Sequence, residues 1–187
     1  PVISWQCKRT EPFVLRCEDY IPFKELYSIS GVHKFSFNTI YTLLWLKENK
    51  PAVLDEMEGF LFITSLFIYR LSGIKANDTT MAGTSMLTDI RTRNFSEKIL
   101  ADTGLSDRFF ALYEPGTVVG EMNTESAEAM GLVPGIAVVL GGHDTQFAIL
   151  GSGAEKNDVV LSSGTWEILM TRSENVRLGE ESLKEEL

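Results

Sequence analysis

The sequence is poor in cysteine and in clustered positive charge, and each shortage excludes a class of protein. Cys7 and Cys17 are too few for a disulfide framework or a zinc site, so we expect a reduced, cytoplasmic setting. The 17 basic and 26 acidic residues give a net charge of −9 without a basic stripe, which argues against nucleic-acid binding. The most apolar run, residues 60–71, is too short to cross a bilayer and contains Arg70, so no membrane role is expected.

The familiar nucleotide-binding motifs are also missing. There is no Walker A sequence, and residues 151–153 (GSG) lack the third glycine and the helix of a dinucleotide fingerprint. His33 and His143 are the two histidines, too few for a metal-dependent phosphohydrolase of the His-Asp type, and no metal ligands are predicted. Because the chain begins with Pro1 rather than Met, we expect further residues upstream.

The pattern of strands separated by helices predicts an α/β protein. Because 44% of the 187 residues are hydrophobic, the chain can build a substantial core. The pattern predicts buried strands at 1–5 and 134–140, and the unbroken apolar run of the second favours a parallel sheet. An apolar run at 60–71 reads as a strand that leads into a helix ending at Gly73. Helical patterns cover 11–30 with a break near Pro22, 39–49, 51–57, 95–103 and 126–130.

The composition shifts to glycine and charge at residues 151–158. Beyond this point two short strands flank a Ser-Ser-Gly-Thr turn at 162–165, and such a pair is marginal without further strands. We therefore predict one domain over residues 1–156 and a second, incomplete domain over 157–187.

Asp144 follows a strand and a Gly-Gly turn, in the polar cluster His-Asp-Thr-Gln at 143–146. An aspartate there suits the N-cap of a helix, because its carboxylate accepts hydrogen bonds from free backbone N–H groups. It also suits a catalytic carboxylate, and the two roles are compatible.

Two further features each allow a structural and a functional interpretation. The turn at 162–165 is either a tight connection between strands or a phosphate cradle formed by backbone N–H groups. Trp5 is either a core residue or, with Arg9 close behind it, part of a sugar site. Asp78, Thr80 and Ser85 read as capping and loop residues in a loop or an exposed helix start.

The order of five segments resembles the FGGY carbohydrate kinases: WQCKR (5–9), FSFNTIYTLLWLKEN (35–49), DTTMAGTSMLTDI (78–90), GGHDTQFA (141–148) and SSGTWEIL (162–169). The resemblance implies two ribonuclease H-like domains of the actin, sugar kinase and Hsp70 ATPase type, with the active site in the cleft between them. This chain would then hold most of the first domain and the start of the second.

The resemblance also implies a function, the ATP-dependent phosphorylation of L-fuculose to L-fuculose 1-phosphate. Asp144 matches the general base, and the sugar-binding residues are expected to be Trp5, Arg9, Phe37, His143 and Gln146. The ATP phosphates are expected at Ser163, Gly164 and Thr165, with ATP and Mg²⁺ as cofactors. A kinase for another ketose such as L-rhamnulose and a non-catalytic sugar-binding module are the alternatives, and a homo-oligomer is left open.

The sequence departs from the family pattern in three places. Cys7 stands where the family often has Asp, and Thr42 stands where its helix signature usually has Lys. The Asp-Gly-Thr phosphate loop and the Gly-rich adenosine motif do not occur, and the resemblance implies that both lie outside this segment. The chain is therefore expected to hold the base and much of the sugar pocket without a complete nucleotide site.

Overall fold

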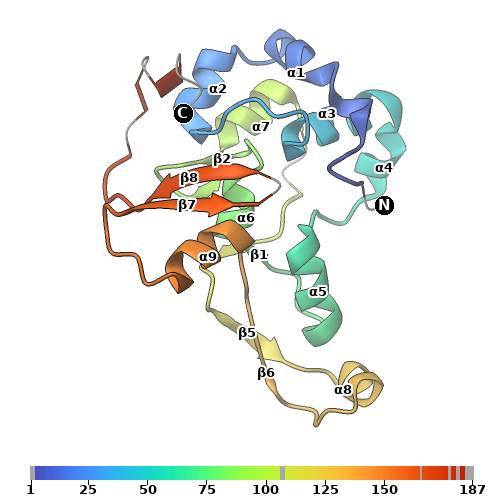
Figure 1. Cartoon of the computed structure of the whole chain (residues 1–187). Coiled ribbons are helices and arrows are strands. Elements are labelled where there is room, and N and C mark those ends of the chain that lie inside the picture. Colours follow the sequence, from blue (N-terminus) through green and yellow to red (C-terminus); the bar gives the residue numbers. More distant parts are fainter. Residues whose placement is uncertain (1–2, 106–107, 165, 177, 180–181, 184–187) are drawn as a thin grey trace.

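The computed structural model describes every residue except 1–2, 106–107, 165, 177, 180–181 and 184–187 (Figure 1). Its α-helices are α1 Phe13–Arg16, α2 Phe23–Ser30, α3 Thr39–Asn49, α4 Pro51–Glu56, α5 Ile63–Ser72, α6 Thr79–Gly83, α7 Glu97–Thr103, α8 Thr124–Met130 and α9 Asp144–Gly151. Two short 3-10 helices, η1 Lys8–Thr10 and η2 Cys17–Asp19, lie near the beginning.

The strands are short and pair two at a time in the described part of the chain. The parallel pair is β1 Asn77–Asp78 with β4 Leu112–Tyr113. The antiparallel pairs are β2 Thr88–Asp89 with β3 Asn94–Phe95, β5 Val118–Glu121 with β6 Ala137–Val139, and β7 Val159–Ser163 with β8 Glu167–Thr171.

The main core lies around α3 and combines residues of the N-terminal helices with residues of α7 and the segment before it. The predicted helix at 39–49 is confirmed residue for residue, and its apolar positions Ile40, Leu43, Leu44 and Leu46 are all buried. Asn38 is the N-cap residue, but its side chain does not cap the helix. Instead its Oδ1 accepts a hydrogen bond from the N–H of Phe35 at 2.7 Å, while its Nδ2 donates to the carbonyl of Thr84 at 2.9 Å. The loop before α3 is thereby fixed against α6.

Two predicted strands differ from the structure. In the described part of 1–5, Ile3 and Ser4 have no regular structure and Trp5 begins a turn, closed by the Cys7 N–H on the Ser4 carbonyl at 3.0 Å. The predicted strand at 134–140 is reduced to β6, and its antiparallel pairing with β5 contradicts the expected parallel sheet. The reason is that only one face is covered: Val138 is buried against residues from α5 and α8, whereas Val139 is 46% exposed.

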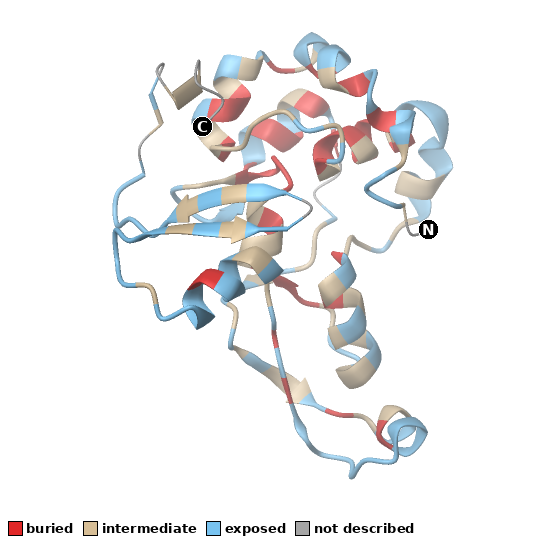
Figure 2. Cartoon of the chain, in the orientation of Figure 1, coloured by how far each residue is buried: buried red, intermediate tan, exposed pale blue. Residues whose placement is uncertain are grey.

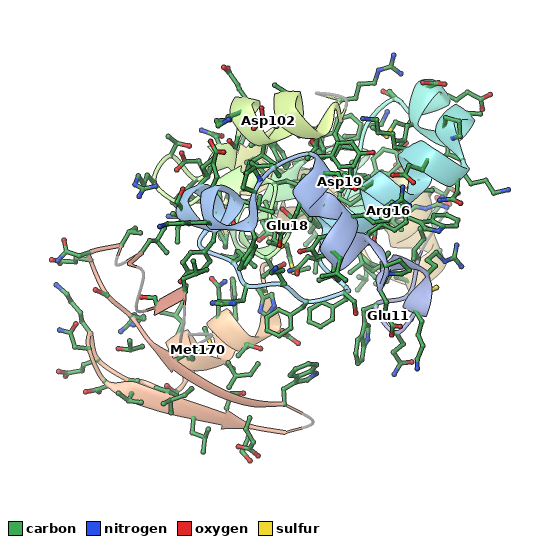
Figure 3. All side chains as sticks on the ribbon, turned by 90° about the horizontal axis from the view of Figure 1, so that it is seen from above. Glu11, Arg16, Glu18, Asp19, Asp102 and Met170 are labelled. Atoms are coloured by element: carbon green, nitrogen blue, oxygen red, sulfur yellow. The ribbon has the colours of Figure 1, made fainter. Side chains whose placement is uncertain are left out.

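The elements form a helical body with two projections (Figure 1). The β5–β6 pair and α8 extend away from the body as an arm, and the β7–β8 hairpin lies beside α9. Buried residues are concentrated in the helical body, whereas the two strands of the hairpin, β7 and β8, contain none (Figure 2). Seen from above, the hairpin that carries Met170 lies to one side of the helices that carry Arg16 and Glu18 (Figure 3).

Candidate functional site

Asp144 is the first residue of α9, directly after the loop that leaves β6. Its carboxylate is 95% exposed, and Oδ1 accepts a hydrogen bond from the backbone N–H of Thr145 at 2.7 Å. The N-cap residue is His143, so the N-cap interpretation of Asp144 is off by one position. A negative charge in the first helical turn is favourable, because the helix dipole is positive at that end.

A chain of hydrogen bonds holds the backbone next to Asp144. The N–H of His143 donates to Thr80 Oγ1 at 2.8 Å, and the Thr80 hydroxyl donates to Asp78 Oδ1. Asp78 is 1% exposed and also caps α6, accepting from the N–H groups of Thr80 at 2.9 Å and Met81 at 2.8 Å. The start of α9 is therefore attached to the start of α6 through a buried carboxylate.

The sequence had given Asp78 and Thr80 only as capping or loop residues in an exposed segment. The capping role is confirmed for Asp78, whereas Thr80 lies inside α6, and the expected exposure is wrong, since Asp78 and Ser85 are buried. The contact with His143 joins residues 63 positions apart, and no local pattern could reveal it.

Gly142 lies inside this arrangement. A Cβ at this position would come within 2.5 Å of Phe147 Cε2 and 2.6 Å of Thr80 Oγ1, which is closer than real Cβ contacts. At Gly141 a Cβ would meet no atom within 4 Å. Only the second glycine of the pair is therefore required for the close approach of the two segments.

Trp5 and Phe37 line a cavity of about 520 Å³ beside α3. Their rings meet edge to face, with centroids 6.1 Å apart, and Met81 of α6 also lines this cavity. The cavity thus borders the same helix whose Thr80 holds His143. A second groove, of about 630 Å³, lies between Lys47 and Arg108 and contains none of the predicted site residues.

Arg9 reaches the same cavity through Cys7. The Arg9 guanidinium lies 4.7 Å from the centre of the Trp45 ring, and its Nε donates to Cys7 Sγ at 2.8 Å. Cys7 lines the cavity. The backbone N–H of Arg9 and, after it, the Arg9 side chain hold the pKa of the Cys7 thiol below its usual value.

His143, Asp144 and Gln146 are not among the residues that line this cavity. Gln146 is exposed on α9, and His143 Nδ1 lies 3.3 Å from Asp144 Oδ1 without forming a hydrogen bond. The structure thus places the predicted sugar-site residues in two groups, one at the cavity and one at the start of α9.

The turn between β7 and β8 is confirmed, and it carries the third group of predicted residues. The N–H of Gly164 donates to the Trp166 carbonyl at 3.2 Å, and the Ser163 hydroxyl donates to Glu167 Oε1 at 2.8 Å. A Cβ on Gly164 would meet no atom within 4 Å, so its backbone is open to approach. Thr165 lies outside the described residues.

Trp166, directly after this turn, contacts the aromatic side of the cavity. Its ring meets Phe37 edge to face at 5.9 Å between centroids and Phe35 at 6.2 Å. Phe35 and Phe37 stack at 5.3 Å. The turn and the cavity wall are thus joined by ring contacts, which the sequence did not predict.

The architecture that carries these groups is that of the sugar kinases. A xylulose kinase from Lactobacillus acidophilus superposes with a TM-score of 0.82 at 24% identity, over 89% of this chain and 34% of that one. The predicted fold class, an α/β fold of the ribonuclease H-like type found in actin, sugar kinases and the Hsp70 ATPase, is confirmed.

Sequence comparison then identifies the family within the sugar kinases. The N-terminal domain of the FGGY family of carbohydrate kinases matches residues 1–151, and the chain belongs to this family. It is 51% identical over 177 residues to the L-fuculokinase of Escherichia coli K12, covering 94% of this chain and 38% of that protein. A rhamnulokinase of an Enterobacter species is 31% identical over 169 residues, covering 89% of this chain and 34% of that protein.

The chain therefore spans well under half the length of these relatives. Within the described residues, no helix combines the length and apolar character needed to span a membrane.

Proposed function

We propose that the protein to which this chain belongs transfers phosphate from ATP to L-fuculose, giving L-fuculose 1-phosphate. The observation that carries the proposal is the 51% identity to an L-fuculokinase over 94% of this chain. The corresponding identity to a rhamnulokinase is 31%, which favours L-fuculose over L-rhamnulose as the substrate.

Asp144 is proposed as the general base that takes the proton from the attacking sugar hydroxyl. Support comes from its exposed carboxylate and from the backbone of His143, which is held by Thr80. An ordinary aspartate is a weak base at neutral pH, so it accepts the proton late, as the new P–O bond forms. Such assistance is typically worth about 10²- to 10⁴-fold in rate.

Trp5 and Phe37 are proposed to pack against the C–H groups of the sugar, since both rings line the cavity. Arg9, His143 and Gln146 are proposed to bind its hydroxyl groups. In this assignment the thiol of Cys7 occupies the place where the family often has a carboxylate. The backbone N–H of Arg9 and, after it, the Arg9 side chain lower the pKa of this thiol.

Ser163, Gly164 and Thr165 are proposed to receive the ATP phosphates. The turn fits an anion in space, because Gly164 is open to approach and the flanking residues are small. The Ser163 hydroxyl would exchange its present partner, Glu167, for a phosphate oxygen, whereas the Gly164 N–H would keep its hydrogen bond to the Trp166 carbonyl, which shapes the turn. Bound Mg²⁺ would supply charge neutralisation, and it usually binds through substrate phosphates and one or two carboxylates. Within the described residues, no three His, Cys, Asp or Glu side chains gather as a metal site.

We further propose that residues 1–156 belong to the sugar-binding domain and 157–187 to the ATP-binding domain. The family match over 1–151 supports the first boundary. The proposed reaction consumes ATP, a cytoplasmic metabolite, and the proposal therefore places it in the cytoplasm.

A coupled assay of ADP formation by the full-length protein tests this function. L-Fuculose, L-rhamnulose and D-xylulose are compared, with an ATP-only reaction as the control. The proposal expects the largest kcat/KM with L-fuculose. A larger value with L-rhamnulose would establish the alternative ketose, and sugar binding without any phosphorylation would establish the non-catalytic module.

A further inference from the structure

Four aromatic rings from two distant parts of the chain form one cluster, which we call the aromatic clasp: Trp5, Phe35, Phe37 and Trp166. Phe37 is central, since its ring contacts the other three, at centroid distances between 5.3 and 6.1 Å. All four rings are between 39% and 57% exposed. They are therefore held by one another, and the tightly packed core does not enclose them.

The two ends of the clasp lie at different functional groups. Trp5 and Phe37 line the cavity, whereas Trp166 follows the β7–β8 turn. The carbonyl of Trp166 accepts the hydrogen bond of the Gly164 N–H, so the position of the indole and the shape of the turn are coupled through one residue. If the Phe37 ring shifts when the cavity fills, Trp166 and the adjoining turn would consequently shift with it.

We propose that Trp166 is a positioning residue that couples occupation of the sugar pocket to the phosphate-binding turn. When sugar packs against Trp5 and Phe37, the ring of Phe37 is fixed, and Trp166 then holds the Ser163–Gly164 backbone in place. This inference rests on the function proposed above, because it takes the cavity as the sugar pocket and the turn as the phosphate cradle. It assigns no chemical step to Trp166.

The size of the effect follows from the ring contacts. An aromatic pair contributes the equivalent of roughly a 2- to 12-fold change in an equilibrium constant beyond its buried area. Trp166 makes two such edge-to-face contacts, with Phe35 and Phe37. Because coupling between two ligands is reciprocal, loss of Trp166 weakens each ligand's effect on the other by the same factor.

The test measures the affinity of the full-length protein for a non-hydrolysable ATP analogue with Mg²⁺, in the presence and absence of the sugar substrate. In wild type the sugar is expected to tighten binding of the analogue. Trp166→Ala is expected to abolish this tightening and to raise the sugar KM by roughly fivefold to tenfold. Trp166→Phe, which keeps an aromatic edge, is expected to retain most of the coupling, and Leu15→Ala, an exposed apolar residue outside the clasp, serves as the matched control.

A double-mutant cycle with Phe35→Ala completes the experiment, because Phe35 contacts Trp166 without lining the cavity. Non-additive effects on the coupling support the clasp, and additive effects or unchanged coupling in Trp166→Ala overturn it. If melting curves show that Trp166→Ala is unfolded, Trp166→Leu takes its place with the same expectations. A wild-type protein that phosphorylates no sugar refutes the proposed function, whereas an active wild type with unchanged coupling in the variant refutes only the role of Trp166.

Discussion

At the scale of single residues, the same side chain type behaves differently according to what surrounds it. Cys7 lies beside the Arg9 guanidinium at the cavity, and Cys17 is 2% exposed in the main core. Contact with Arg9 lowers the pKa of the Cys7 thiol, whereas burial raises the pKa of Cys17 to about 11. Cys7 is therefore expected to ionise at a lower pH than Cys17.

This contrast predicts selective alkylation. Only the thiolate is nucleophilic, so a lowered pKa means that Cys7 reacts with iodoacetamide at a lower pH than an unperturbed thiol does. Cys17 is expected to stay unmodified in the folded protein, and Arg9→Ala is expected to shift the Cys7 profile upward. Peptide mass spectrometry across pH 6–10 gives both profiles, and a Cys7 profile that does not lie at lower pH than that of a cysteine in a short unstructured peptide would refute the prediction.

Asp144 gives the second prediction at this scale. Asp144→Asn in the full-length protein keeps the shape of the side chain but removes the proton acceptor, so kcat is expected to fall by about 10²- to 10⁴-fold. Sugar binding is expected to survive, and the lost charge–dipole interaction should cost only about 0.3–1 kcal/mol of stability. Steady-state kinetics and sugar titration measure the two effects. Asp19→Asn, an exposed aspartate on the helical body, is the control, and near-normal turnover in Asp144→Asn would falsify the base assignment.

At the scale of elements, α6 and α9 act as one unit, because Thr80 and Asp78 join their N-terminal ends. The fit at Gly142 is close enough that no side chain is accommodated there. The position of Asp144 thus depends on packing between two short helices as much as on its own loop.

The Gly-Gly pair offers a matched test of this dependence. Gly142→Ala should push Thr80 away from His143 and destabilise the protein by about 1–3 kcal/mol, as overpacking typically does. Gly141→Ala meets open space and should change stability by less than about 0.5 kcal/mol. Urea unfolding of the full-length protein measures the stability of both variants. Equal losses of stability in the two variants would show that the close contact between α6 and α9 does not exclude a side chain at position 142.

The helices were the elements that the sequence predicted best. The pattern at 39–49 gave both the bounds and the buried face of α3, since one face of a helix can be read from a local repeat. Glycine stops at Gly73, Gly104 and Gly131 were also confirmed, each as a left-handed residue that ends a helix.

At the scale of the whole molecule, local patterns were insufficient. The run at 134–140 looked like a strand covered on both faces, but its pairing with β5 depends on how the arm folds, and one face of β6 is left partly in water. The contact of Thr80 with His143 and that of Phe37 with Trp166 likewise join distant segments. Nothing near these residues in the sequence specifies such partners, so the residue types of the candidate site could be predicted but its geometry could not.

The aromatic side of the cavity also determines how the protein can be observed. The chain has three tryptophans: Trp5 lines the cavity, Trp45 lies under the Arg9 guanidinium, and Trp166 touches Phe37. Trp5 thus lines the cavity and Trp166 contacts its wall at Phe37, whereas Trp45 reaches it through Arg9 and Cys7. The ultraviolet emission of this chain is therefore a label-free report on that region. A molecule bound in the cavity is expected to change the surroundings of the indoles, whereas events in the β5–β6 arm are expected to leave the emission unchanged.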